Sequence, residues 1–208
     1  LTASASVTLS QTGTGGTTCI NTATLAKWTF PSTAFTSPGS LSAPTQDTTP
    51  KLVTGSASVA GSVAGVTSTT TDSNTADGSY AWKTDHWPNS GAPNTTDYLF
   101  FSVPQTGTPY DEVSINFSYK LGSSWANPTT LYVAYNNNGG AYTSLSSFNI
   151  TDVIYHNTGA LKATTTGSSS SAFRINLSKS PNNQGQVFID DVTITACTQY
   201  GSPLPPTL

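Results

Sequence analysis

The richest local set of side chains that could do chemistry lies in residues 82–87, which read Trp-Lys-Thr-Asp-His-Trp. Exposed indole rings of Trp82 and Trp87 can stack on sugar rings while Asp85 and His86 bond to sugar hydroxyls, because ligand sites combine aromatic walls with a few fixed polar groups. The alternative is that the Trp side chains close one end of a hydrophobic core, the usual use of large aromatic residues. The pattern gives a candidate polysaccharide site and a structural alternative to it.

Hydrolytic catalysis finds weak support in the sequence. The chain has two histidines, His86 and His156, and neither falls in a recognisable nucleophile motif. Charged residues make up 8 % of the chain, so the carboxylates are too sparse to nominate a glycosidase pair. Seven Lys and Arg residues and a net charge of −3 leave no basic stripe for nucleic acid. We therefore expect a protein that is not an enzyme and does not bind nucleic acid.

The two cysteines, Cys19 and Cys197, lie near opposite ends of the chain. Metal sites need further ligands close by, and redox pairs are usually closer in sequence. We expect one structural disulfide between the first and last strands, which implies an oxidising compartment. No apolar run approaches the roughly 20 residues that span a bilayer. With Leu1 in place of an initiator Met, these features predict a secreted or cell-surface protein whose signal peptide has been removed.

The elements that must position these residues are strands. Ser and Thr form about a third of the chain, and apolar side chains recur with period two, as in Val113, Ile115, Phe117 and Tyr119. Asn and Gly residues at 136–140 predict a hairpin to residues 141–145. We expect an all-β, two-sheet antiparallel sandwich, a jelly roll with an extended N-terminal strand. The predicted strands are Thr24–Phe30, Lys51–Val53, Ser56–Val63, Tyr98–Val103, Val113–Leu121, Thr130–Tyr135, Ala172–Leu177 and Val187–Ala196.

Two segments carry a family resemblance. Residues 187–197 read Val-Phe-Ile-Asp-Asp-Val-Thr-Ile-Thr-Ala-Cys, and residues 25–30 read Leu-Ala-Lys-Trp-Thr-Phe. They resemble the closing and opening strands of jelly-roll modules in secreted bacterial proteins, among them carbohydrate-binding modules and adhesin domains. The resemblance spans about residues 20–197 as a pattern. Because members differ in ligand and activity, it bears on the fold more than on the function.

The resemblance also raises the question of a structural calcium, which some of these modules hold where the first and last strands meet. It carries over only to Asp190 and Asp191, since Pro31 and Ser32 stand where such members often have an acidic residue. Asp190 shares parity with Phe188, Val192, Ile194 and Ala196 and should lean towards the core, where a carboxylate must be paired, hydrogen-bonded or metal-bound. Calcium takes about six to eight oxygen ligands. The alternative is a carboxylate that caps nearby backbone amides or sits at a β-bulge.

The N-terminal segment suggests a function of its own. Its first ten residues alternate apolar side chains with Ser and Thr, and a Gly-rich stretch follows at residues 11–16. We expect an arm at 1–18, a sandwich at 19–197 and a Pro-rich tail at 198–208. The favoured hypothesis is a structural subunit that forms filaments or a surface layer by donating this strand to a neighbouring copy. The alternative is a carbohydrate-binding or adhesive module with polysaccharide as partner. The assembly strand would use Leu1, Ala3, Ala5, Val7 and Leu9.

Overall fold

The computed structural model describes most of the predicted sandwich. The described ranges are 21–30, 55–60, 81–84, 98–105, 110–122, 129–165, 170–178 and 186–198, without the side chains of residues 21, 59, 60 and 198. Within these ranges all regular structure is β-strand, and no helix there is long and apolar enough to cross a membrane. The expected all-β class is confirmed.

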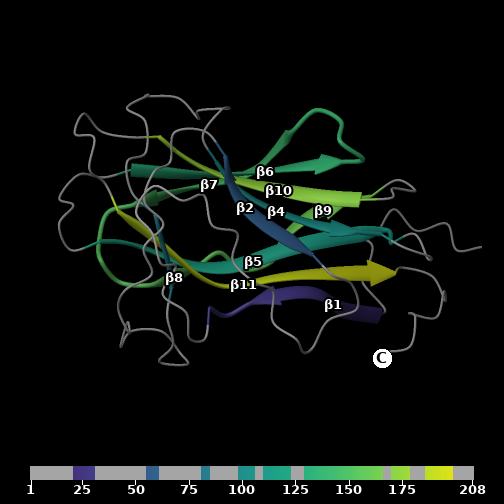
Figure 1. Cartoon of the computed structure of the whole chain (residues 1–208), viewed down its shortest axis with the longest axis horizontal. Coiled ribbons are helices and arrows are strands. Elements are labelled where there is room, and N and C mark those ends of the chain that lie inside the picture. The colour runs from purple at the N-terminus through teal and green to yellow at the C-terminus, as the bar shows by residue number, and fades with distance from the viewer. Residues whose placement is uncertain are drawn as a thin grey trace, which may run out of the picture.

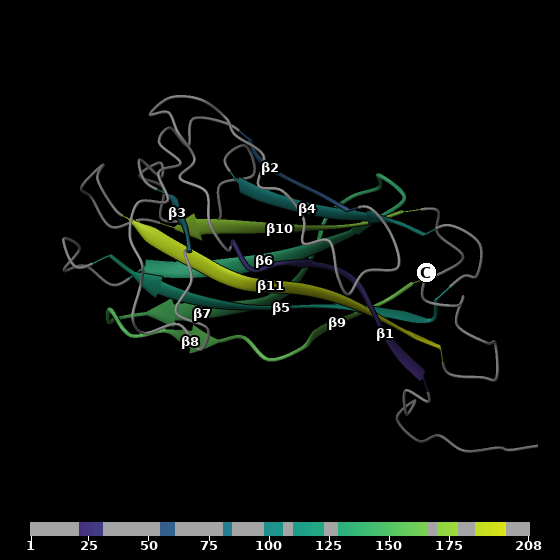
Figure 2. The same ribbon diagram turned by 60° about the horizontal axis from the view of Figure 1, so that its bottom comes forward.

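The strands form two antiparallel sheets that face each other (Figure 1). One has six strands: β1 (Asn21–Trp28), β11 (Val187–Thr198), β5 (Glu112–Leu121) and β8 (His156–Asn157) in order, with β3 (Trp82–Thr84) paired to β11 and β9 (Leu161–Thr164) to β5. The other has five, in the order β2 (Ser56–Ala60), β4 (Tyr98–Pro104), β10 (Ser170–Ser178), β6 (Thr129–Asn137) and β7 (Thr143–Ile150). Figure 2 shows β11, in yellow, running between β1 and β5.

Alternating side chains of both sheets fill the space between them. On β10, Phe173, Ile175 and Leu177 have no exposed surface, and the residues between them face outward. Two indole rings occupy the centre of the core: Trp28 and Trp82 each contact the Phe101 ring nearly edge-on, with centroids 5.2 and 5.7 Å from it. The period-two pattern therefore predicted which side chains are buried.

Seven of the predicted strands are confirmed, with ends that differ by a few residues. The prediction for residues 51–53 lies outside the described residues. The short strands β3, β8 and β9 were not predicted, because two to four residues are too few to show a hydrophobic period. The boundaries of the N-terminal arm and the C-terminal tail also lie outside the described residues and stay predictions.

The hairpin between β6 and β7 is confirmed and is tightly built. Asn138 and Gly139 have φ of 55° and 73°, and the Gly140 amide donates to the Asn137 carbonyl at 3.1 Å. Positive φ at both central residues defines the type I′ turn that suits the twist of paired strands. The Asn138 amide also donates to the Ser170 carbonyl at 3.1 Å, so the turn is anchored to the first residue of β10.

Candidate functional site

The outer face of the five-stranded sheet carries a group of aromatic side chains. Tyr98 and Phe100 lie on β4, Tyr132 lies on β6, and Tyr142 lies between the hairpin turn and β7; all four are half-buried. Tyr98, Phe100 and Tyr132 point away from the core because their strand neighbours, such as Leu99 and Leu131, point into it. We call these four rings, together with Arg174 of β10, the aromatic platform.

Strand register aligns the platform across three strands. On β10, Arg174 pairs with Phe100 of β4, and Asn176 pairs with Tyr132 of β6. Because Ile175 pairs with Leu99, Tyr98 lies level with Asn176 on the opposite side of β10. Tyr98 and Tyr132 are therefore two strand spacings apart, about 10 Å. That spacing gives two separate stacking positions along one line.

Arg174 holds the centre of the platform between two rings. Its Cζ lies 4.0 Å from the centroid of Tyr98 and 3.5 Å from that of Tyr142. Tyr135 pairs with Thr143 and Asn136 with Ala172, so Tyr142 approaches Arg174 from the side away from Tyr98. Burial raises the pKa of Tyr142, and the charge and hydrogen bond of Arg174 oppose that shift.

Small polar groups border the platform. The Ser56 and Ser102 hydroxyls lie 2.8 Å apart on β2 and β4, and the Thr130 hydroxyl donates to the Asn149 amide oxygen at 3.0 Å on β6 and β7. Both pairs are exposed. Aromatic faces bordered by exposed hydroxyl and amide groups suit a ligand whose rings have apolar faces and carry hydroxyl groups at their edges.

A hollow of about 450 Å³ between the β6–β7 hairpin and β9 is a weaker candidate. Most of its lining is small or aliphatic, and its one ring belongs to Tyr135. The Tyr135 hydroxyl bonds to Ser171 at 3.0 Å and to Asn137 at 3.2 Å, and the ring packs on Phe173. This ring serves the packing of the sandwich end, so the hollow offers no separate stacking surface.

Of the four site residues predicted in the cluster at residues 82–87, the structure describes only Trp82. Trp82 has no exposed surface and packs between Phe30 and Phe101, so the prediction of an exposed stacking ring is wrong for Trp82, and the core alternative holds. Its neighbours Asp85, His86 and Trp87 lie outside the described residues. Trp82 is buried because β3 pairs with β11 in a register that turns its side chain inward beside Ile189.

Asp190 is fully buried, as predicted, and it lies at a β-bulge. The inward positions of β11 change from Val187 and Ile189 to Val192 across this bulge, and Asp191 has a φ of 50°. The Asp191 amide donates to the Asp190 carboxylate at 2.8 Å. The bulge falls where the neighbour of β11 changes from β3 to β1. Both features of the alternative, an amide bonded to the carboxylate and a β-bulge, are therefore present at Asp190.

Calcium at this bulge fits the described residues poorly. One Asp190 oxygen already accepts an amide hydrogen bond, and the charge of Asp190 acts on Lys120. No cluster of three or more acidic, His or Cys side chains that could hold a metal occurs in the described ranges. We therefore derive no role for a metal ion from Asp190 and Asp191.

Lys120 forms a second contact between a cation and aromatic rings, on the outer face of the six-stranded sheet. Its Nζ lies 4.5 Å from the Tyr155 ring centroid and 5.1 Å from that of Phe188, and only 8 % of the residue is exposed. Burial lowers the pKa of Lys120, and the negative charge of Asp190 opposes that shift. Lys120 thus has an acidic group within the protein to balance its charge.

Cys197 is buried on β11 and is not a free thiol. Cys19 lies outside the described residues, so its pairing with Cys197 stays a prediction. The assembly strand Leu1, Ala3, Ala5, Val7 and Leu9 lies outside them as well.

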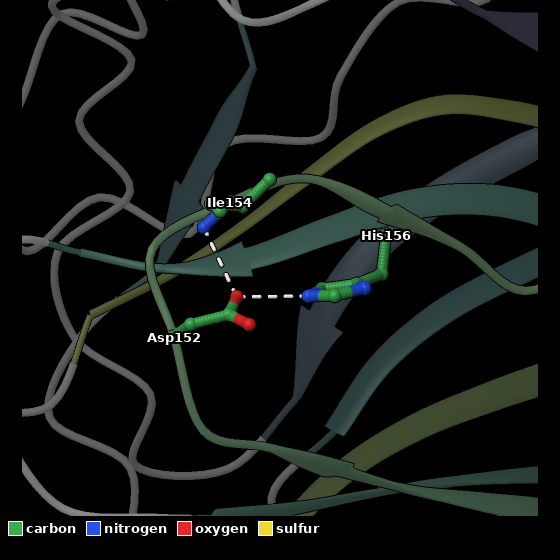
Figure 3. Close-up of polar contacts among 3 residues, drawn as sticks. All are labelled: Asp152, Ile154 and His156. Carbon is green, nitrogen blue, oxygen red and sulfur yellow. Dashed lines mark hydrogen bonds and ion pairs between the residues drawn. The ribbon is translucent and has the colours of Figure 1, made fainter.

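Asp152, in the loop from β7 to β8, pairs with His156, the first residue of β8. The His156 Nε2 atom lies 2.8 Å from the Asp152 carboxylate, which also accepts the Ile154 amide at 3.1 Å (Figure 3). The hydrogen bond from His156, followed by that of the Ile154 amide, holds the pKa of Asp152 below its usual range. The other contact of His156 is the Tyr119 ring, at 5.8 Å, and within the described residues no hydroxyl nucleophile bonds to it. The pair fixes a loop and does not form a catalytic triad.

The platform residues are functional candidates that the sequence analysis did not identify. A signal was present in β4, where Tyr98 and Phe100 place aromatic rings on one face of the strand and Phe101 places one on the other. A second signal was Arg174, the single arginine of the chain, between two core residues of β10. Neither signal indicates which side chains lie next to each other, because pairing between distant strands brings together Tyr98, Tyr142 and Arg174.

Comparison with known proteins establishes the fold class. No family model and no curated protein matches the sequence. The structure is similar to the CBM22-1 xylan-binding domain of Xyn10C from Paenibacillus barcinonensis, with 12 % identity, coverage of 85 % of this chain and 96 % of that one, and a TM-score of 0.57. It is also similar to the CBM22-1–CBM22-2 tandem of that protein, at 14 % identity, 88 % and 49 % coverage and a TM-score of 0.51, so the chain spans about half of the tandem.

At sequence identities of 12 % and 14 %, the structural similarity is evidence for a shared fold only. It confirms the predicted resemblance to carbohydrate-binding jelly-roll modules at the level of architecture. Strand donation and filament formation find no support in these comparisons. The chain is a two-sheet β-sandwich of the kind found in carbohydrate-binding modules.

Proposed function

We propose that this protein is a non-catalytic polysaccharide-binding module whose ligand lies across the aromatic platform. The observation that carries the proposal is the set of four half-buried rings around Arg174 on one sheet face. Soluble proteins rarely leave a contiguous aromatic surface exposed unless it binds something. We also propose that the protein acts outside the cell, which its composition favours.

The ring geometry favours an extended sugar chain. Tyr98 and Tyr132 lie level on either side of β10, so a polymer that crosses β4, β10 and β6 can place one sugar ring on each. Each stacked pair desolvates an apolar ring face, while exposed hydroxyls such as those of Ser102 and Thr130 stay available to the ligand's polar edge. The similar domain from Paenibacillus barcinonensis is described as xylan-binding, which makes xylan a sensible first probe.

Affinity electrophoresis in gels that contain soluble xylan, β-glucan, galactan or polygalacturonate tests the proposal. The parent protein should be retarded by at least one polymer, and Tyr132→Ala should weaken that binding about tenfold or more, equal to ~1.4 kcal/mol. Phe188→Ala is the matched control, since it removes a half-buried ring from the outer face of the other sheet. Equal loss in both variants, or no retardation by any polymer, would reject the platform as the site.

A further inference from the structure

The platform contains one charge, and the described strands of its sheet offer it no counter-charge. Arg174 is the single arginine of the chain and projects outward between two core residues of β10. The outward residues around it on the described strands are aromatic, Ser, Thr, Asn or Ala. The ion pairs seen in the described residues join Glu112 to Lys162 and Asp152 to His156, and neither involves Arg174. A half-buried guanidinium without a carboxylate is uncommon, because burial of a charge is unfavourable unless the charge is paired.

The two tyrosine rings determine which part of the guanidinium remains for a ligand. At 3.5 Å from the Tyr142 centroid, Cζ is at van der Waals contact, a distance that requires the planar group to lie face to face with the ring. Tyr98 covers it from the other side at 4.0 Å. Arg174 also forms a side-chain hydrogen bond with Tyr142, and its Nε atom is buried, so the donors left for a ligand are the remaining N–H groups of the two Nη atoms, which match the two oxygens of a carboxylate. Stacking on the tyrosine rings also holds the N–H donors of the guanidinium in a fixed orientation before a ligand binds.

We infer that the polysaccharide bound by the platform carries carboxylate groups, and that a uronic acid unit binds in bidentate fashion to Arg174 while neighbouring sugars stack on Tyr98 and Tyr132. This inference rests on the proposed function. The net charge of −3 disfavours general attraction to polyanions, so a preference for uronates has to come from a local site. The other role open to Arg174 is to hold Tyr98 and Tyr142 in place for a neutral sugar chain.

The experiment compares three uronate polymers with their own neutral forms. Polygalacturonate, alginate and glucuronoxylan are each tested by affinity electrophoresis beside the same preparation after chemical reduction of its carboxyl groups to alcohols. The parent protein should bind at least one acidic polymer about tenfold more tightly than its reduced form, because charge-assisted bidentate bonds are lost. Added salt should narrow this difference.

Variants assign the preference to Arg174. Arg174→Gln should bind the acidic polymer and its reduced form equally, and Arg174→Lys should lose most of the preference because an ammonium group lacks the planar fork. Lys162→Gln is the control, since it removes one exposed positive charge on β9 of the other sheet. Each variant is first compared with the parent protein by thermal melting, so that a folding defect is recognised.

The outcomes separate the two proposals. Equal binding of acidic and reduced polymers by the parent protein, or an unchanged preference in Arg174→Gln, overturns the uronate inference and leaves the platform as a site for neutral sugars. Absence of binding to every acidic and neutral polymer overturns the proposed function itself. If Lys162→Gln also abolished the preference for the acidic polymer, that preference would depend on overall charge, and the uronate inference would be overturned.

Discussion

Among the described residues, two cations lie against aromatic rings, one on each sheet, and they differ in how their charge is balanced. Lys120 contacts Tyr155 and Phe188, and the buried carboxylate of Asp190 stabilises its positive charge. Arg174 contacts Tyr98 and Tyr142 and has no acidic residue beside it in the described part of the chain. The contrast teaches that a cation–ring contact alone does not mark a binding site. A cation whose counter-charge is internal stabilises the fold, whereas a cation without one is available to a ligand.

Removal of the internal counter-charge should give the largest effect on stability. Asp190→Asn keeps the shape and the acceptor for the Asp191 amide but deletes the charge that balances Lys120. We expect the free energy of unfolding in urea to fall by about 2–4 kcal/mol, since breaking a buried charge pair leaves one charge uncompensated.

Asp191→Asn is the control, because its side chain is half-buried on the same bulge. A stability of Asp190→Asn equal to that of the parent would mean that Lys120 does not depend on this carboxylate. A lower melting temperature of the parent in the presence of a chelator would assign Asp190 to a metal ion instead.

Neutralising each cation in turn tests the comparison directly. Lys120→Gln leaves the buried Asp190 without its cation and should lower the free energy of unfolding by about 1–3 kcal/mol. Arg174→Gln loses ring contacts, worth about 0.5–1 kcal/mol near the surface, and the hydrogen bond with Tyr142, but it leaves no buried charge behind. Urea unfolding of both variants under identical conditions measures the difference, and the reverse order would make Arg174 the structural cation.

The smallest effect concerns the ionisation of Tyr142. Burial holds its pKa above the ordinary value of 10.0, while Arg174 acts against that shift, so Arg174→Gln should raise the pKa further. A raised folded-state pKa means that the stability contributed by the neutral phenol is complete below pH 10.0 and is lost as the pH rises through the folded value. Tyrosinate absorbance during alkaline titration, with Tyr142→Phe to identify the signal, measures the change. An unchanged titration would show that Arg174 does not act on this ring.

The sequence predicted the sandwich because its signals are periodic and local. Alternation in Val113–Tyr119 and Phe173–Leu177 predicts strands with one buried face, and Asn138-Gly139 predicts the hairpin that follows β6. Asp190 is buried, but the parity with Val192 that predicted this does not hold, because Asp190 precedes the bulge and pairs with Ser118 on the outer face that carries Lys120. The parity rule applies to only half of β11, since the bulge reverses it and turns Phe188 outward.

The site was less predictable because its parts come together through pairing between distant strands. Tyr98, Tyr142 and Arg174 are separated by tens of residues, and no local spacing indicates that they meet. The Trp82 prediction failed for a related reason. A three-residue strand has no visible period, so the sequence did not tell whether its indole faces water or the core.

The position of Arg174 also bears on how β10 finds its partners during folding. The strand lies between β4 and β6, and its hydrophobic residues Phe173 and Ile175 flank the arginine on both sides. A slip of one residue in either pairing would exchange the two faces, placing a guanidinium in the core and the phenyl ring in water. A misaligned β10 is therefore strongly disfavoured, so the residue proposed to recognise the ligand also enforces the correct alignment of the strand that carries it.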